Sequence, residues 1–261
     1  STLVENEMAA NLVLSYKLKG KSSIDAGYNF RNTSRTFDNL NFVFANPTGA
    51  SVDPNNLDGY FNQENLDAGI IVMETSRGKR SNPNALNPFY YTGDRMVNSA
   101  CVNVTYEFSP AFSMIAGTRV EKFNQEVVWD VAADEIRPNI PGDNMAKDDK
   151  LYILPSMNFK YDLSETNQLR FSASKTYTFP QFKELAPFLY EAVNYNSFGN
   201  PELKPAENLN ADLKFEHYFD DGGLIAVTGY YKHITNSINV IQVNSASLEY
   251  SYLNTGDAFV V

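Results

Sequence analysis

Residues 208–234 read NLNADLKFEHYFDDGGLIAVTGYYKHI, and this stretch decides the fold class. From Leu209 to Phe215, apolar and polar residues alternate one by one, which is the pattern of a β-strand with one apolar and one polar face. Asp220-Asp221-Gly222-Gly223 then supplies turn residues, and residues 224–234 return as a second strand. The stretch therefore predicts a long antiparallel β-hairpin.

Three further hairpins with the same alternation are predicted upstream. Their strands cover 11–18 with 24–31, 99–108 with 112–121, and 151–162 with 169–174, with turns near residues 20, 109–110 and 165–166. The runs are about 9–12 residues long, which matches a tilted membrane strand, whereas ordinary globular strands average about 5–6. Pro155 lies inside one run and, because proline has no amide N–H, predicts a bulge or an edge-like irregularity there.

The connections between these hairpins are long polar stretches, at about residues 32–94, 123–149 and 178–206. Compact soluble domains rarely contain structureless loops beyond about 12–15 residues. Antiparallel neighbours place alternate connections at opposite ends of a sheet, as in outer-membrane barrels with short turns on one side and long loops on the other. The sequence thus predicts an all-β, antiparallel up-and-down meander with long loops at one end. An antiparallel sheet with one face on a soluble core is the alternative.

Composition excludes several other classes of protein. The formal charge is −10 with no basic stripe, so we expect no nucleic-acid partner. No window approaches the roughly 18 consecutive apolar residues of a transmembrane helix. The first residues lack the features of a signal peptide. Cys101 is the single cysteine, so no internal disulfide is expected.

Motifs for bond-making chemistry are not found, so we expect no enzyme and no cofactor. The sequence has no nucleophile-elbow or phosphate-loop pattern. His217 and His233 share one hairpin but should pair near residues 226 and 210, which separates them and predicts no shared metal site. Residues 53–59 superficially resemble a calcium loop, but the ligand spacing is wrong, and Asx turns are expected instead.

Several segments in order resemble the barrel of TonB-dependent receptors, the energised nutrient transporters of Gram-negative outer membranes. The most specific is Gly199-Asn200-Pro201-Glu202-Leu203-Lys204-Pro205. The other segments are 106–121 with its Gly-x-Arg-x-Glu end, the Leu-Pro-Ser strand at 154–161, 169–180, 230–238 and Asn254-Thr255-Gly256. Phe179 precedes Pro180 where the family commonly has arginine, so no role of that arginine is carried over.

This resemblance implies that residues 1–261 form one partial domain of a transmembrane β-barrel, without the plug domain and without the C-terminal closing strands. It implies eight to ten of the roughly 22 strands of such a transporter. The implied function is uptake of a siderophore, cobalamin or oligosaccharide-like nutrient across the outer membrane. The implied partners are that ligand, outer-membrane lipid, the plug and, through it, TonB. A soluble β-sandwich ligand-binding module and a passive porin-like channel are the alternatives.

Two groups of residues are candidate site residues. Rings and a carboxylate in one long loop suit ligand capture, although they could instead pack the loop against its neighbours: Phe188, Tyr190, Glu191, Tyr195 and Phe198. Charged residues on the polar strand faces should line the barrel interior in a structural role: Arg119, Glu121, Arg170, Lys214 and Glu216.

Overall fold

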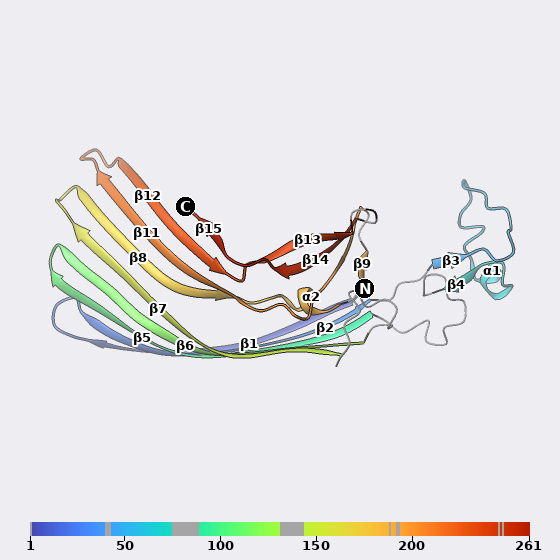
Figure 1. The fold of residues 1–261 in the computed structure, drawn as a ribbon, viewed down its shortest axis with the longest axis horizontal. Coiled ribbons are helices and arrows are strands. Elements are labelled where there is room, and N and C mark those ends of the chain that lie inside the picture. The colour runs from blue at the N-terminus through green and yellow to red at the C-terminus, as the bar shows by residue number, and fades with distance from the viewer. Residues whose placement is uncertain are drawn as a thin grey trace.

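The computed structural model describes residues 2–39, 43–74, 89–130, 144–187, 189–191, 194–244, 246 and 248–261. Its main feature is a nine-stranded sheet in the order β1-β2-β5-β6-β7-β8-β11-β12-β15 (Figure 1). These strands are β1 (Thr2–Lys17), β2 (Ser23–Asn39), β5 (Phe89–Ser109), β6 (Phe112–Asp130), β7 (Met145–Asp162), β8 (Asn167–Thr178), β11 (Ala206–Tyr218), β12 (Leu224–Thr235) and β15 (Ala258–Val260). All neighbours pair antiparallel, so the predicted all-β meander is confirmed.

Smaller elements occupy the connections. A four-stranded sheet contains β13 (Ile238–Asn244), β14 (Glu249–Asn254), β10 (Asn196–Phe198) and β9 (Leu189–Glu191) in that order. A two-stranded sheet pairs β3 (Val43–Ala45) with β4 (Val72–Glu74), and the two helices are α1 (Gln63–Asp67) and α2 (Phe182–Leu185). Neither helix in this described part of the chain is long and apolar enough to cross a membrane.

The two ends of the large sheet differ in their connections. At one end, the turn end, short links join β1 to β2, β5 to β6, β7 to β8 and β11 to β12. Gly20 and Gly222 lie in two of these links with φ of 70° and 85°, a conformation that glycine adopts without steric cost. The long connections leave the opposite end, the loop end. The four predicted hairpins are thus confirmed.

The predicted strand limits are wrong at the loop end. β5, β6 and β7 contain 21, 19 and 18 residues, about twice what crosses a membrane. β2 continues to Asn39 and β6 to Asp130, inside the stretches expected to be loops. The expectation failed because the chain stays extended where the polarity pattern changes. We call the part of each long strand next to the short links its turn half. The part next to the long connections is called its loop half.

Polarity on the two faces inverts between these halves. In the turn half of β6, Met114, Ala116 and Val120 lie on the convex face and Arg119 on the concave face. In the loop half, the convex face carries Lys122, Asn124 and Glu126, and the concave face carries the buried residues Phe123, Val127 and Trp129. The convex face of the strand is therefore apolar near the turn end and mostly polar beyond it, with the exposed Val128 as the exception.

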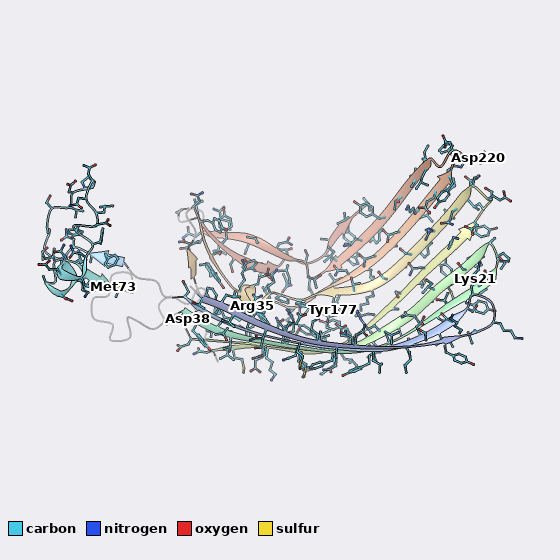
Figure 2. The ribbon with its side chains drawn as sticks, turned by 180° about the vertical axis from the view of Figure 1, so that it is seen from behind. Lys21, Arg35, Asp38, Met73, Tyr177 and Asp220 are labelled. Carbon is cyan, nitrogen blue, oxygen red and sulfur yellow. The ribbon has the colours of Figure 1, made fainter. Side chains whose placement is uncertain are left out.

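The convex face of the turn half is a band of exposed apolar side chains. Members from successive strands are Leu12, Leu14, Tyr28, Val102, Val120, Ile153, Met157, Leu213, Val227 and Tyr231. No second layer of the described chain covers this band (Figure 2). A water-soluble sheet would bury such a face, whereas a transmembrane barrel exposes it to lipid. The β-sandwich alternative is therefore wrong.

A row of aromatic rings borders this band near the turn end. Phe108 stacks on Phe112 with ring centroids 4.9 Å apart, and Phe112 stacks on Phe159 at 6.0 Å. Phe159 in turn stacks on Phe171 at 6.3 Å, and Tyr161 meets Phe112 edge-on. Aromatic rings gather at membrane–water interfaces in outer-membrane barrels, so the row marks one edge of the lipid-facing band.

β7 and β8 separate at Pro155. Their ladder runs from Asp162↔Gln168 to Ser156↔Ser174 and goes no further, although β7 continues to Met145. This is the edge-like irregularity that the proline predicted. Beyond it, β8 and α2 lie over the concave side of β5, β6 and β7 (Figure 1). Tyr177 of β8 stacks on Tyr152 of β7, with centroids 3.9 Å apart and planes 2° from parallel.

Candidate functional site

The concave face of the sheet holds two different environments. Its turn half is polar and open, and its loop half is aromatic and covered by residues 179–187 and 194–205. In a barrel the concave face is the interior, so the side chains of both environments would face the barrel lumen.

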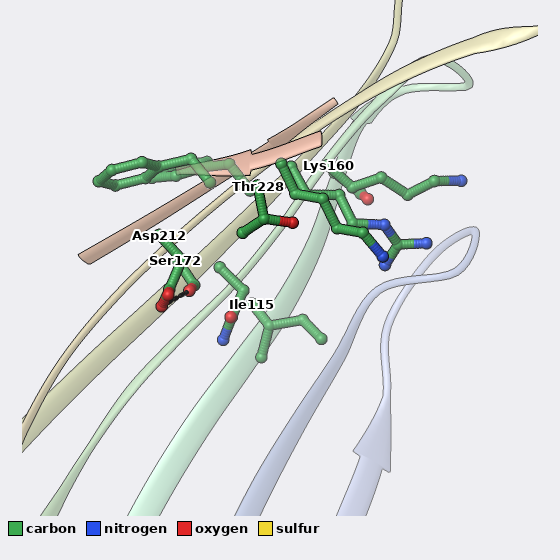
Figure 3. Close-up of a pocket in the computed structure, with 11 residues that line it drawn as sticks. Ile115, Lys160, Ser172, Asp212 and Thr228 are labelled. Carbon is green, nitrogen blue, oxygen red and sulfur yellow. Dashed lines mark hydrogen bonds between the residues drawn. The ribbon is translucent and has the colours of Figure 1, made fainter. Parts of the chain in front are cut away.

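The turn half contains a pocket of about 400 Å³, shown in Figure 3. Lys160, Arg170 and Lys214 bring three cationic side chains to its lining, from β7, β8 and β11. Ser172 donates a hydrogen bond to the carboxylate of Asp212 at 3.0 Å, which fixes the one acidic side chain in the lining. The lining thus carries more cationic than acidic side chains, and the pocket is called here the basic basin.

The five residues predicted to line the interior form two ion-pair groups on the concave face. Arg119 Nε lies 3.1 Å from Glu121 Oε2, within one strand. Glu216 accepts from both Arg170 Nε at 3.0 Å and Lys214 Nζ at 2.6 Å. The carboxylates of Glu121 and Glu216 are almost fully buried, whereas the cations are about half exposed. Each carboxylate is therefore paired with cations of the sheet itself. The half-exposed cations remain accessible from the concave side.

Residues 179–187 and 194–205 pack on the loop half through an apolar core. Phe182, Leu185, Ala186 and Leu203 from this segment meet Tyr91, Val127, Trp129 and Ala146 from the sheet. Helix α2 is a single short turn, with Glu184 accepting from the backbone N–H of Gln181 at 2.9 Å. The segment lies on the wall inside the concave side and is called here the inner segment.

Two arginines from the sheet lie on the rings of the inner segment. The guanidinium carbon of Arg95 is 4.2 Å from the ring centroid of Phe179 and 5.1 Å from that of Phe182. Arg35 lies 5.3 Å from the Phe182 ring, and its Nε donates to Glu5 at 2.6 Å. Such cation–π contacts contribute about 0.5–2 kcal/mol, more when desolvated. They hold the inner segment to β2 and β5.

A hydrogen bond from the sheet also holds the inner segment. Gln125 is buried on β6, and its Nε2 donates to the carbonyl oxygen of Pro180 at 3.0 Å. Phe179, beside it, stacks on Phe123 with centroids 5.4 Å apart. At position 179 this chain thus has an aromatic ring that packs on Phe123 of the sheet.

The Gly-Asn-Pro-x-Leu-Lys-Pro motif closes the inner segment. The N–H of Gly199 donates to Ala186 O at 3.2 Å, and the N–H of Asn200 donates to Glu184 O at 2.6 Å. The Asn200 side chain donates to Tyr252 O at 3.0 Å and accepts from the N–H of Glu202 at 3.0 Å. The motif therefore joins α2, through backbone hydrogen bonds, to the small sheet, which the Asn200 side chain contacts.

The predicted ligand-binding loop is spread over two environments. Phe188 lies outside the described residues, and so does the side chain of Glu191, whose backbone ends β9. Phe198 is buried. Tyr195 is exposed and meets Tyr250 edge-on, with centroids 5.7 Å apart. Of the described members, Tyr195 is the one with a ring open to solvent.

Tyr190 is partly buried beside the sheet. Its ring lies 5.7 Å from Phe37, and its hydroxyl shares a hydrogen bond with Tyr91. Burial, followed by the neighbouring Tyr91, raises the pKa of Tyr190 far above its ordinary value, so the phenol stays neutral. Tyr190 thus links the small sheet to β2 and β5.

The histidines and the 53–59 loop lie as the sequence suggested. His217 pairs with Ile225 and His233 with Leu209, which places them apart along the ladder. Asp53 accepts from the N–H of Asn55 at 2.9 Å, so the predicted Asx turn is confirmed. The described ranges contain no cluster of His, Cys, Asp and Glu suited to a metal ion.

Sequence reasoning missed Gly93, Arg95, Gln125 and Phe182, which position the inner segment. The signal available was the run from Phe123 to Trp129, where apolar residues occupy the same alternate positions that carry polar residues earlier in the strand. That change of phase marks a strand whose inner face becomes covered.

A curved antiparallel sheet with an exposed apolar convex band, a polar concave face and long connections at one end defines the wall of an outer-membrane β-barrel. The family model described as TonB dependent receptor-like, beta-barrel matches residues 5–260. The chain belongs to the TonB-dependent receptor family, whose members are outer-membrane proteins of Gram-negative bacteria.

Solved structures agree with this fold. The ferric-catecholate import receptor Fiu from K12 E. coli is 13% identical with a TM-score of 0.54, over 99% of this chain and 34% of that one. The ferric yersiniabactin uptake receptor FyuA from Yersinia pestis is 13% identical with a TM-score of 0.54, over 98% of this chain and 31% of that one. The copper transporter OprC is 12% identical with a TM-score of 0.59, over 98% of this chain and 33% of that one. The chain thus spans about a third of these proteins. No curated protein sequence matched the chain.

Proposed function

We propose that this chain forms part of the wall and outer connections of a receptor that takes up a scarce nutrient across the outer membrane by TonB-dependent active transport. The observation that carries the proposal is the inversion of polarity along the strands. An apolar convex band near the turn end places that half in lipid, and the covered, aromatic loop half then extends above the membrane. The turn end faces the periplasm in this arrangement.

Among the described residues the large sheet ends in unpaired edges at β1 and, on the other side, at β15 and the part of β12 before Lys232. Unpaired edges are not stable in lipid, because no water is present to satisfy their N–H and C=O groups. We infer that further strands of the intact receptor complete the barrel and that residues 1–261 are a partial barrel domain.

We propose that the basic basin contacts a plug domain inside the completed barrel. Lys160, Arg170 and Lys214 present half-exposed cations at the level of the membrane. A plug with carboxylates on its surface would pair with them, and motion of the plug under TonB would break those pairs. Interior ion pairs of this kind are reversible, since each contributes little when water has access.

For the ligand, the concave loop half favours an anionic chelate such as a ferric siderophore over cobalamin or a neutral oligosaccharide. Arg31 is more than half exposed and is 3.7 Å from Glu7, a loose pair. Arg95 forms no ion pair within 4.0 Å among the described residues, although Glu5 and Glu7 act on its charge from further away, and it lies on rings. Cationic groups beside aromatic rings suit an anionic, ring-containing ligand. Tyr195, with Phe188 and Glu191, remains our proposal for the outer contact with ligand.

Transport by a strain that lacks the receptor gene, complemented with the intact gene, tests this function. We expect the deletion strain to lose growth under iron starvation with a ferric siderophore as iron source, and the intact gene to restore it. Uptake that persists after the proton-motive force is collapsed would indicate the porin-like channel instead. Arg31→Gln should weaken chelate binding severalfold, whereas Lys21→Gln at the turn end should not.

A further inference from the structure

Residues 43–74 form a small module in the connection between β2 and β5. β3 pairs with β4 through Phe44↔Met73, and α1 lies between them in sequence. Tyr60 and Ile71 are buried in the module, and Asn62 caps α1 by accepting from the N–H of Asn65 at 2.8 Å. The segment thus has a local structure of its own, although it is too short to fold in isolation.

Three apolar side chains form an exposed patch on this module. The rings of Phe44 and Phe61 are 5.3 Å apart, and Met73 lies opposite Phe44 in the two-stranded ladder. Phe44, Phe61 and Met73 are each more than 40% exposed, at 46%, 45% and 42%. Figure 2 shows Met73 in this module, away from the large sheet. Clustered exposed rings and methionine are typical of surfaces that bind a partner.

Within the module the charged residues have one sign, and the cationic residues of this connection, Arg77, Lys79 and Arg80, follow it in sequence outside the described residues. Asp53, Asp58, Glu64 and Asp67 are all exposed, and no lysine or arginine occurs between Val43 and Glu74. Opposite charge on a partner would steer it to the patch and fix its orientation. An anionic membrane surface would be repelled, and so would a second copy of this chain, whose own formal charge is −10.

We propose that residues 43–74 dock a positively charged peptide segment that carries apolar side chains. The apolar side chains of that segment contact Phe44, Phe61 and Met73, and its lysines or arginines face the surrounding carboxylates. This inference rests on the proposed orientation, which places the connection between β2 and β5 outside the cell.

Binding of a synthetic peptide to the intact receptor tests the proposal. The probe is a labelled peptide of alternating lysine and leucine, measured by anisotropy against receptor in zwitterionic nanodiscs, with empty nanodiscs as the blank. Peptides of lysine with serine, and of glutamate with leucine, test the need for each component. We expect the lysine–leucine peptide to bind at least about tenfold more tightly than either of the others.

Two sets of variants distinguish specific binding at the module from a nonspecific effect of negative charge on the receptor. Phe44→Ser with Phe61→Ser, and Asp58→Asn with Glu64→Gln and Asp67→Asn, should each weaken binding by about tenfold or more. The matched control neutralises three exposed acids at the turn end: Asp220→Asn, Asp221→Asn and Glu165→Gln. Equal weakening by the control, or unchanged binding by both module variants, would overturn the proposal.

The orientation of the module and the uptake of iron chelate are measured in separate experiments. Asp58→Cys in a Cys101→Ser background should react with an impermeant thiol reagent on intact cells, and failure to react would overturn the outward placement and this inference with it. If the receptor transports iron chelate but its module binds none of the peptides, the docking proposal falls and the proposed uptake stands.

Discussion

The ring of Phe182 occupies the space that a side chain on Gly93 would need. A Cβ built on Gly93 would lie 2.6 Å from both Cγ and Cδ1 of Phe182, closer than real carbon atoms approach. The two residues are far apart in sequence, and their contact joins α2 to the middle of the wall. The absence of a side chain at position 93 is therefore what lets the inner segment lie flat on the sheet.

Gly93→Ala should displace α2 and destabilise the receptor by about 1–3 kcal/mol, because the core has no room for an extra methyl group. Urea unfolding in detergent measures the stability, and tryptic cleavage after the exposed Lys183 measures displacement of the segment. Combining the change with Phe182→Leu should recover part of the loss. Strictly additive effects of the two substitutions would contradict the contact.

Gly199→Ala should be more damaging than the same change at Gly229. A Cβ on Gly199 would lie 2.2 Å from the backbone oxygen of Ala186, which cannot move without opening the turn. Gly229 has nothing within 4 Å of its Cβ position. We expect a loss of about 1–3 kcal/mol or more at position 199 and about 0.5 kcal/mol or less at position 229, from equilibrium unfolding. Similar losses at both positions would show that the close approach does not matter.

Val227→Arg and Thr228→Arg should have opposite outcomes although the residues are adjacent on β12. Val227 pairs with Phe215 on the convex face, whereas Thr228 pairs with Lys214 and borders the basic basin. Arginine in lipid costs about 2–4 kcal/mol near the bilayer midplane, whereas arginine toward a wet interior has access to water. Folding yield and stability in liposomes measure the difference. Equal tolerance of both would argue against a lipid-facing convex band.

Arg95 and Phe179 should be energetically coupled. A double-mutant cycle with Arg95→Met and Phe179→Leu should give an interaction free energy of about 0.5–2 kcal/mol, the range of cation–π contacts. Added salt should change this energy little, because ring and guanidinium are partly desolvated. A coupling below about 0.3 kcal/mol would mean that the two residues act independently.

The alternating stretches near the turn end were sufficient to predict hairpins, faces and the order of strands. Leu209 to Phe215 and its return strand illustrate why: the signal depends on side chains two residues apart, and the turn residues follow directly. The Gly199–Pro205 motif was also recognised in sequence, yet its role as a backbone junction with Tyr252 required the structure.

What the sequence alone determined is local: period-two alternation fixes a strand and its apolar side, since neighbouring side chains point to opposite faces whatever surrounds them. What only the tertiary structure decided is the loop half, where Phe123, Val127 and Trp129 carry the apolar positions to the inner face. Their meaning depends on Phe182 and Leu203, which reach them from distant parts of the chain. No local pattern reports whether a distant segment will fold back to cover a face, so the length of the strands and the place of the inner segment appeared only in three dimensions.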